Sequence, residues 1–354
     1  MAINLLLTTT FLFLGLSLCT FAQAEEKRID WYGYAQTDLS TTDEPEQAKG
    51  FRLSRVNLIG DFVPASRVRF LGDIEFEDGA DHSVDRLQGT IKLSRAFLEY
   101  TFFSQLRLRA GKILTPFGLY NEVHDFTATY FSLEVPRIYK PHAFFNGLQK
   151  QRIFAKYSTG VEGFGTFDLG SDGAQLDYAV TISNGRGETL SGGDINGTPG
   201  TSLRAVYRPG GGSPWQFGAS AYQDRNHEGI GGTSDDPEQT YALDVQFETS
   251  KLQIQCESAL GRFSAPSGRR HTALLSYGQV AYTFFDVLTP YIQHSVERYD
   301  LRDSEGQHQE TRVGTAWNFA PGFFLKGEAR FFAGELQEQD INYHAYFLSA
   351  AIAF

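Results

Sequence analysis

The sequence predicts an all-β fold, a transmembrane antiparallel β-barrel of about sixteen strands with short periplasmic turns and long extracellular loops. Three observations lead to this fold class. After the first 24 residues the chain has no run of the roughly 18 apolar residues that a membrane helix needs. Strand-like segments with two-residue periodicity instead follow one another to the C-terminus, joined by alternately short and long connections. Because lipid cannot hydrogen-bond to open backbone groups, a closed barrel is the β architecture that can span a bilayer.

The N-terminus has the pattern of a secretory signal. An apolar stretch from Ile3 through Leu18 is followed by small and polar residues that end in Ala22-Gln23-Ala24. We expect a signal peptide over residues 1–24, cleaved before Glu25, and a single barrel domain over residues 25–354. Cleavage leaves Cys256 as the sole cysteine, so no disulfide can form within the mature chain.

The strand pattern continues through the rest of the chain. Aromatic residues and glycine are abundant, with 30 Phe, 17 Tyr and 36 Gly. Candidate strands lie near residues 30–39, 51–62, 67–77, 90–103, 106–113, 159–168, 175–183, 201–208, 214–223, 239–249, 251–261, 272–284, 289–298, 309–319, 323–333 and 343–354.

The connections assign the two ends of the barrel. Tight turns such as 104–105 and 320–322 alternate with long connections rich in Gly, Asp, Ser and Pro, such as 40–50 and 184–200. An even strand number places both ends of the mature chain beside the short turns, as bacterial outer-membrane barrels require. We therefore expect the long connections to be extracellular and the protein to lie in the bacterial outer membrane, among its lipids and lipopolysaccharide.

Alternation within the segments separates a lipid face from a water face. In residues 67–77, for example, Val68, Phe70, Ile74 and Phe76 interleave with Arg67, Arg69, Asp73 and Glu75. In residues 323–331, Phe323, Leu325, Ala329 and Phe331 likewise interleave with Lys326, Glu328 and Arg330. One such strand is equally typical of a soluble, half-buried sheet. A long series of them favours a barrel whose polar faces line one aqueous lumen.

Aromatic residues gather at strand ends beside the short turns, which predicts a periplasmic girdle at headgroup level. A hydrophobic core cluster is the alternative, but a core has no reason to concentrate its rings beside turns. The residues of the expected girdle are Tyr100, Phe102, Phe103, Phe284, Phe285, Trp317, Phe319, Phe323 and Phe324.

Two stretches resemble the bacterial porins related to the phosphate-selective porins O and P. The first is residues 95–125, which include the segment Lys112-Ile113-Leu114-Thr115-Pro116-Phe117-Gly118-Leu119-Tyr120-Asn121-Glu122. The second is the C-terminus, an amphipathic strand ending in Phe354 that looks like the signal recognised by the barrel-assembly machinery. The resemblance implies a sixteen-stranded barrel, commonly a homotrimer, with its third long loop folded inward. It also implies passive diffusion of small hydrophilic solutes or ions, without a cofactor or an energy source.

The third loop, residues 114–159, is by far the longest connection, and loops of this length usually have a function. We expect it to narrow the pore opposite Arg107 and Arg109 of the adjoining wall; the alternative is an ordinary solvated surface loop. The residues expected at the constriction are Arg107, Arg109, Glu122, Asp125, Arg137, Lys140 and Arg152.

Charge indicates a weak preference for anions, such as phosphate or other small anions. The formal net charge is -11, which argues against nucleic-acid binding. Strand parity places similar numbers of acids and bases in the lumen, so the preference depends on the arginines beside the third loop. The inward charges expected from parity are Arg55, Arg67, Arg69, Arg107, Arg109, Arg204, Arg312, Lys326 and Arg330 against Asp73, Glu75, Glu77, Asp177, Asp244, Glu248, Glu257, Glu297 and Glu328.

Signs of catalysis are few. The sequence has no G-x-S-x-G elbow, no H-E-x-x-H pair and no phosphate-binding glycine loop before a helix, so we expect no catalytic or metal site. The alternative function is an outer-membrane barrel enzyme, a lipid or ester hydrolase. Its candidate pair, His294 and Ser295, are sequence neighbours and should face opposite sides of a strand. A secreted adhesin or solenoid is disfavoured because no fixed-period repeat is visible.

Overall fold

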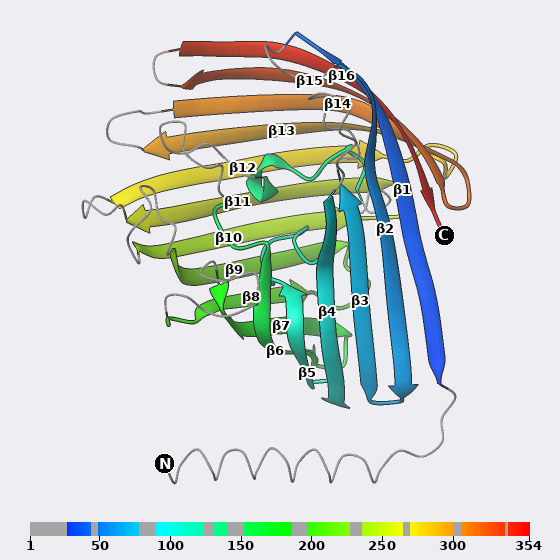
Figure 1. Ribbon diagram of the computed structural model, residues 1–354, viewed down its shortest axis with the longest axis vertical. Helices are drawn as coiled ribbons and strands as arrows, with labels where there is room; N and C mark the ends of the chain where they lie inside the picture. Colours follow the sequence, from blue (N-terminus) through cyan, green and yellow to red (C-terminus); the bar gives the residue numbers. More distant parts are fainter. Residues whose placement is uncertain are drawn as a thin grey trace.

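The chain forms a closed antiparallel β-barrel in a computed structural model (Figure 1). The structure describes residues 27–43, 49–77, 90–123, 130–140, 152–185, 197–226, 236–264, 270–300, 306–336 and 339–354. The expected signal peptide over residues 1–24 lies outside the described residues. None of the helices in these ranges is long and apolar enough to cross a membrane.

Sixteen strands make up the wall, as the sequence predicts. They are β1 (Arg28–Thr42), β2 (Gly50–Ala65), β3 (Val68–Glu77), β4 (Thr90–Phe103), β5 (Leu106–Leu114), β6 (Tyr157–Leu169), β7 (Ala174–Ser183), β8 (Gly200–Arg208), β9 (Trp215–Asn226), β10 (Asp236–Glu248), β11 (Leu252–Ser264), β12 (Arg270–Tyr282), β13 (Leu288–Asp300), β14 (Gly306–Ala320), β15 (Phe323–Leu336) and β16 (Gln339–Ala353).

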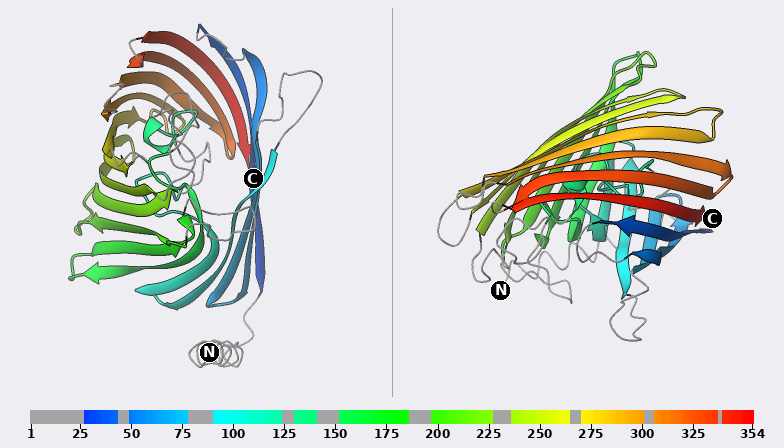
Figure 2. Two further views of the ribbon diagram at one scale, coloured as in Figure 1. Left: turned by 60° about the vertical axis from the view of Figure 1, so that its left-hand side comes forward. Right: turned by 90° about the horizontal axis from the view of Figure 1, so that it is seen from above.

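Each strand pairs with its sequence neighbours, and β1 pairs with β16 to close the ring. This up-and-down order removes every sheet edge, which is what a barrel in lipid requires. The connection between β5 and β6, residues 115–156, does not stay outside the wall. Figure 2 (left view) shows the part of it that carries the 3-10 helix η3 (Arg137–Tyr139) inside the barrel.

The outer surface is apolar and carries most of the expected ring of aromatic residues beside the short turns. Phe324 is the exception, because it lies on the face of β15 that also carries the buried Lys326 and Glu328. Phe284, Trp317 and Phe323 are exposed on the outer surface, and Phe285 is the most exposed of the group. Several of these rings contact one another, as Trp317 does with Phe319 and Phe319 with Phe323. These rings therefore lie on the surface that meets lipid and do not form an internal core.

The seam between β1 and β16 depends on Gly33 and the C-terminal residue. Gly33 and Phe354 exchange two backbone hydrogen bonds, of 2.9 and 3.0 Å. The Phe354 ring lies directly over Gly33, so that a β-carbon at this position would come within 2.4 Å of the ring. The glycine thus provides the space into which the last side chain of the chain packs.

We expect Gly33→Ala to weaken barrel closure. The added methyl group would displace the Phe354 ring, and overpacking of this kind costs about 1–3 kcal/mol. The urea midpoint of the detergent-folded protein measures the effect. Gly72→Ala is the matched control, because the nearest atom to a β-carbon there is 3.7 Å away. Equal midpoints for the two variants would contradict the seam interpretation.

Candidate pore constriction

The segment 115–156 is attached at its base by a hydrophobic cluster. Phe117 and Phe154 stack with their ring centroids 4.3 Å apart, and both are fully buried. Both rings belong to one buried hydrophobic cluster, which also contains inward side chains of β9–β12 such as Tyr222 and Leu275. The Asn121 side chain donates to the carbonyls of Thr115 and Lys156 at 2.6 and 3.1 Å, which holds the two ends of the loop together.

Polar contacts then follow the loop along the wall. The Gly118 amide donates to Ser220 of β9 at 3.0 Å, and the Tyr139 hydroxyl donates to Glu257 of β11 at 2.5 Å. Farther on, the Arg137 guanidinium forms a two-pronged pair with Glu297 of β13. β13 is eight strands from β5 in a ring of sixteen, so the loop reaches the wall opposite its own origin. The loop therefore crosses the lumen.

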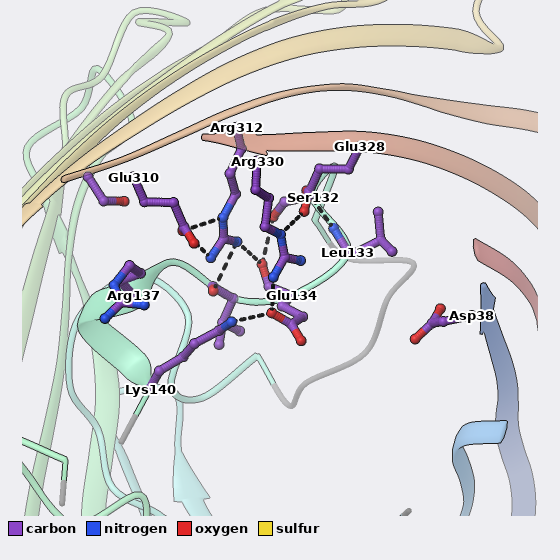
Figure 3. Close-up of polar contacts among 12 residues, drawn as sticks. Asp38, Ser132, Leu133, Glu134, Arg137, Lys140, Glu310, Arg312, Glu328 and Arg330 are labelled. Carbon is purple, nitrogen blue, oxygen red and sulfur yellow. Dashed lines mark hydrogen bonds and ion pairs between the residues drawn. The ribbon is translucent and has the colours of Figure 1, made fainter. Parts of the chain in front are cut away.

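A charged network anchors the loop to β14 and β15 (Figure 3). The Arg312 guanidinium donates to the loop carbonyls of Glu134 and Val135 at 2.9 and 3.3 Å, and to the Glu310 carboxylate at 2.6 Å. Arg330 pairs with the Glu134 carboxylate at 2.7 Å, and Lys140 pairs with the same group. The loop thus contributes both a carboxylate and backbone oxygens to buried cations of the wall.

Lys326 of β15 extends the same anchoring. Its ammonium donates to the carbonyls of Tyr130 and Ser132 at 2.5 and 3.0 Å, and the Leu133 amide donates to Glu328 at 3.1 Å. Backbone oxygens that would otherwise need water are satisfied by a charged side chain. The position of the loop is consequently set by side chains of the wall.

The wall formed by β2–β6 carries a second set of ion pairs. In each pair the carboxylate is buried and the arginine is more exposed. The Arg95 side chain is 17% exposed and its partner Asp73 is 0% exposed, while Arg55 is 21% exposed and its partner Glu75 1%. Nearer the periplasmic end, Arg69 is 37% exposed against 9% for Asp61. Water in the lumen therefore meets guanidinium groups more than it meets carboxylates.

Arg107 and Arg109 lie on the lumen side of β5, as parity predicts. Arg109 bridges Glu99 and Glu162 at 3.4 Å each, and its guanidinium lies over the Phe164 ring, 4.2 Å from the centroid. Arg107 stacks on the same ring at 4.4 Å. Stacking on an aromatic face holds each guanidinium in one orientation.

The structure divides the residues expected at the constriction into three groups. Arg107, Arg109 and, within electrostatic range of Arg109, the exposed Glu122 lie on the β5 side of the lumen. Arg137 and Lys140 lie at the opposite wall. Arg152 donates to the Tyr139 carbonyl at 2.8 Å and so braces the loop itself. Asp125 lies outside the described residues.

Several charged lumen residues are absent from the parity list; they include Asp38, Asp61, Arg95, Glu99, Glu162, Asp224, Glu238, Glu310 and the loop residue Glu134. Of these, Arg95 and Glu99 share β4 with Lys92. The spacing of three residues between Lys92 and Arg95 does not fit strict alternation. A β-bulge at Ser94 shifts the register between Asp73 and Ile74 of the paired strand, which lets all three face inward. The three-residue spacing between Lys92 and Arg95 is the sequence signal from which the bulge could have been predicted.

The hydrolase pair predicted to face opposite sides does so. Ser295 is buried on the lumen side, whereas His294 is exposed on the outer surface, where its Nδ1 lies 2.9 Å from Thr311 Oγ1. Within the described ranges, no group of three or more His, Cys, Asp and Glu residues could hold a metal ion.

The Lys140 charge is expected to make ion preference depend on pH. Burial, together with Arg312 and Arg330, outweighs Glu134 and lowers the pKa of Lys140 to about 8. Burial disfavours ionisation of Glu134, but the neighbouring cations, Arg330 first, hold the pKa of Glu134 well below its usual value. As pH rises from 7 to 9, Lys140 therefore loses its proton while Glu134 stays charged. We therefore expect the candidate constriction to become more negative as pH rises, which would lower the permeability of anions relative to cations.

Reversal potentials across a salt gradient at pH 7 and pH 9 measure this change. Lys140→Arg keeps the charge at both values and should remove this contribution to the pH dependence. Lys140→Gln should show at pH 7 the preference that the unmodified protein shows at pH 9. An unchanged pH response in both variants would mean that another group titrates.

Comparison with known proteins shows a similar fold in solved outer-membrane proteins. An anion-selective porin from Comamonas acidovorans aligns with a TM-score of 0.66 and 12% identity, over 93% of this chain and 100% of that one. A loop-deletion mutant of OmpT, an outer membrane protein of Vibrio cholerae, gives 0.65 and 13% identity over the same shares. The outer membrane channel DcaP of Acinetobacter baumannii gives 0.62 and 12% identity, over 94% and 99%.

No protein-family model and no curated protein matches the chain. At these identities the structural similarity establishes the fold alone. A closed sixteen-strand barrel of this kind, with an apolar outer surface, places the chain in the bacterial outer membrane.

Proposed function

We propose that the protein is a porin that lets small hydrophilic solutes and ions diffuse passively across the outer membrane, with a weak preference for anions. The observation that carries this proposal is the loop 115–156. It crosses the lumen from β5 to β13 and is anchored there by buried ion pairs. A crossing loop narrows a barrel without closing it, provided that water reaches the remaining wall, and the partly exposed arginines of β2–β5 meet that condition.

The proposed anion preference follows from the fact that the arginines lie closer to the lumen than the carboxylates do. In the β2–β6 wall the carboxylates are buried behind the arginines that they pair with, so the nearest charge to a passing ion is positive. Rings of charge in a narrow passage set ion preference through the local field. Because each arginine is partly neutralised by its partner, the preference should be weak. Chloride, phosphate and other small anions are the proposed favoured solutes.

The assembly that we propose is a homotrimer, as in the sixteen-strand porins related to the phosphate-selective porins O and P that the sequence resembles. One Vibrio cholerae OmpT structure of the same fold is described as a trimer form. We further propose that Phe354 is read by the barrel-assembly machinery before its ring packs over Gly33. Lipopolysaccharide would surround the extracellular half of the barrel.

Planar-bilayer recording tests the proposed function. The purified mature protein should give stable single-channel steps, and the reversal potential across a potassium chloride gradient should have the sign of mild anion preference. Replacing Arg55, Arg69 and Arg95 by Gln should shift that potential toward cations, because their buried carboxylates would then be unpaired. A cation preference in the unmodified protein would overturn the proposed selectivity.

Enzyme assays distinguish the proposed channel from the alternative, a lipid or ester hydrolase. A folded protein that gives no conductance but hydrolyses lipid esters, or reacts with a serine-directed probe, would replace the porin with an enzyme. With Ser295 and His294 on opposite faces, we expect neither reaction.

A further inference from the structure

A patch of polar side chains interrupts the apolar outer surface over β11–β14. Ser258, Ser276 and His294 are the middle residues of three successive 13-residue strands. Ser258 pairs with Ser276 across β11 and β12, and their hydroxyls lie 2.7 Å apart. Cys256, Gly278, His294 and Thr311 follow one another in register across β11–β14. We refer to Cys256, Ser258, Ser276, His294 and Thr311 as the outer polar patch.

The outer polar patch lies inside the apolar belt and not at its edge. On the periplasmic side, its strands carry the exposed residues Val280, Ile292 and Val313. On the extracellular side, β12 continues with the exposed Leu274, which pairs with β11 at the partly buried Leu260. Apolar residues on both sides place the patch at the level of the hydrocarbon core. Local thinning of the membrane would expose polar residues only at the edge of the apolar belt, so it does not account for polar residues in the middle of the belt.

Polar groups at this level are costly if they face lipid. Lipid offers no hydrogen-bond partner, and an ionisable side chain within the membrane usually faces protein or water. His294 uses Nδ1 for Thr311, and the ring is exposed. On the neighbouring strand β10, the outward residue Leu243, which pairs with Ser258, is apolar and exposed. The patch therefore differs from the apolar surface around it, and polar groups at this level are most stable when they contact protein.

We propose that the outer polar patch is the site where a second copy of this chain packs in the oligomer. This inference rests on the homotrimer of the proposed function and specifies which wall forms its interface. The patch is complementary to itself, because serine and threonine hydroxyls both donate and accept hydrogen bonds. Its side chains are small apart from His294, and Gly278 lies between Cys256 and His294, so two walls can approach closely.

Charges near the extracellular ends of the same strands favour the same partner. Arg298 of β13, Gln307 of β14 and Glu335 of β15 lie in one row of the sheet, all exposed. One face thus presents a base and an acid two strands apart. When copies of this face meet around a symmetry axis, the arginine of one can approach the glutamate of the next. A lipid headgroup would be attracted by the arginine but repelled by the glutamate.

Cys256 provides a native probe of this interface, since it is the sole cysteine of residues 25–354 and is exposed on the patch. Outer membranes containing the unmodified protein are treated with a short bis-maleimide, and the products are separated under denaturing conditions. We expect covalent dimers. The matched control is Cys256→Ser combined with Leu98→Cys, which moves the thiol to an exposed apolar position on β4, seven strands away from β11. We expect this variant to stay monomeric after treatment.

A second measurement avoids dependence on thiol geometry. The triple variant Ser258→Leu, Ser276→Leu, His294→Leu is compared with the unmodified protein by native mass measurement in detergent during dilution. If the patch is the interface, the concentration at which the oligomer half-dissociates should rise at least tenfold. If the patch faces lipid, the change should leave that concentration unaltered, and the interface is wrongly placed.

The outcomes separate the two proposals. A protein that is monomeric in native membranes and in detergent would overturn the homotrimer and this inference together. An oligomer whose copies cross-link through Leu98→Cys but not through Cys256 would leave the homotrimer standing and overturn the placement of its interface. Conductance by the monomer would still support the porin function in either case.

Discussion

Removal of residues 123–151, with a short Gly-Ser linker between residues 122 and 152, is expected to raise single-channel conductance several-fold. The deleted segment contains Arg137, which reaches the wall opposite its origin, and Glu134, which binds β15. Without it, the passage would be limited by the barrel wall. The fold should survive, because Phe117, Asn121 and Phe154 remain to close the base of the loop. Wall cations such as Arg312 would then face water.

The same deletion should weaken ion preference as well as raise conductance, because a wider passage places ions farther from the arginines of β2–β5. The unmodified chain, folded by the same protocol, is the control, and far-ultraviolet circular dichroism confirms that both are barrels. Equal conductance for the two proteins would mean that the narrowest point lies elsewhere, and the constriction assigned to this loop would be wrong.

The fold was accessible from sequence because its signals are local. Two-residue alternation in segments such as 67–77 reports the lipid and water faces directly, and short turns beside exposed rings such as Trp317 mark one end. The strand boundaries move outward by up to four residues, as at β16, because pairing continues beyond the apolar belt into the rims. Periodicity weakens there, although the backbone hydrogen bonds continue.

The site was less accessible because its contacts join distant parts of the chain. The charged residues of the third loop could be named, but the partner of Arg137 is Glu297 and that of Glu134 is Arg330. No spacing in the sequence links these pairs. The expectation that the loop faces Arg107 and Arg109 captured the side with Glu122, whereas the anchoring takes place at β13–β15. The bulge at Ser94 likewise appears only when β3 and β4 are paired.

Arg312→Met is expected to cost the largest share of stability among single substitutions in the anchor. Arg312 is 0% exposed, and its partner Glu310 is 3% exposed. Removing one member of a buried ion pair typically costs about 3–5 kcal/mol, and Glu310 would keep only the weaker interactions with Arg330, Lys140 and Arg137. The loop also loses the two hydrogen bonds to the carbonyls of Glu134 and Val135. The urea midpoint in detergent should fall, and single-channel current should become noisier as the loop loses its anchor.

The double variant Arg312→Met, Glu310→Gln separates the two contributions. It removes the Glu310 charge but still lacks the hydrogen bonds to the loop, so most of the lost stability should return while the current noise persists. A double variant as unstable as the single one would show that the loss comes from packing or from the loop contacts. The buried Glu310 charge would then have no part in it. If the double variant regains stability but its current stays noisy, Arg312 has two separate roles. It neutralises Glu310 in the wall, and it holds the loop across the lumen.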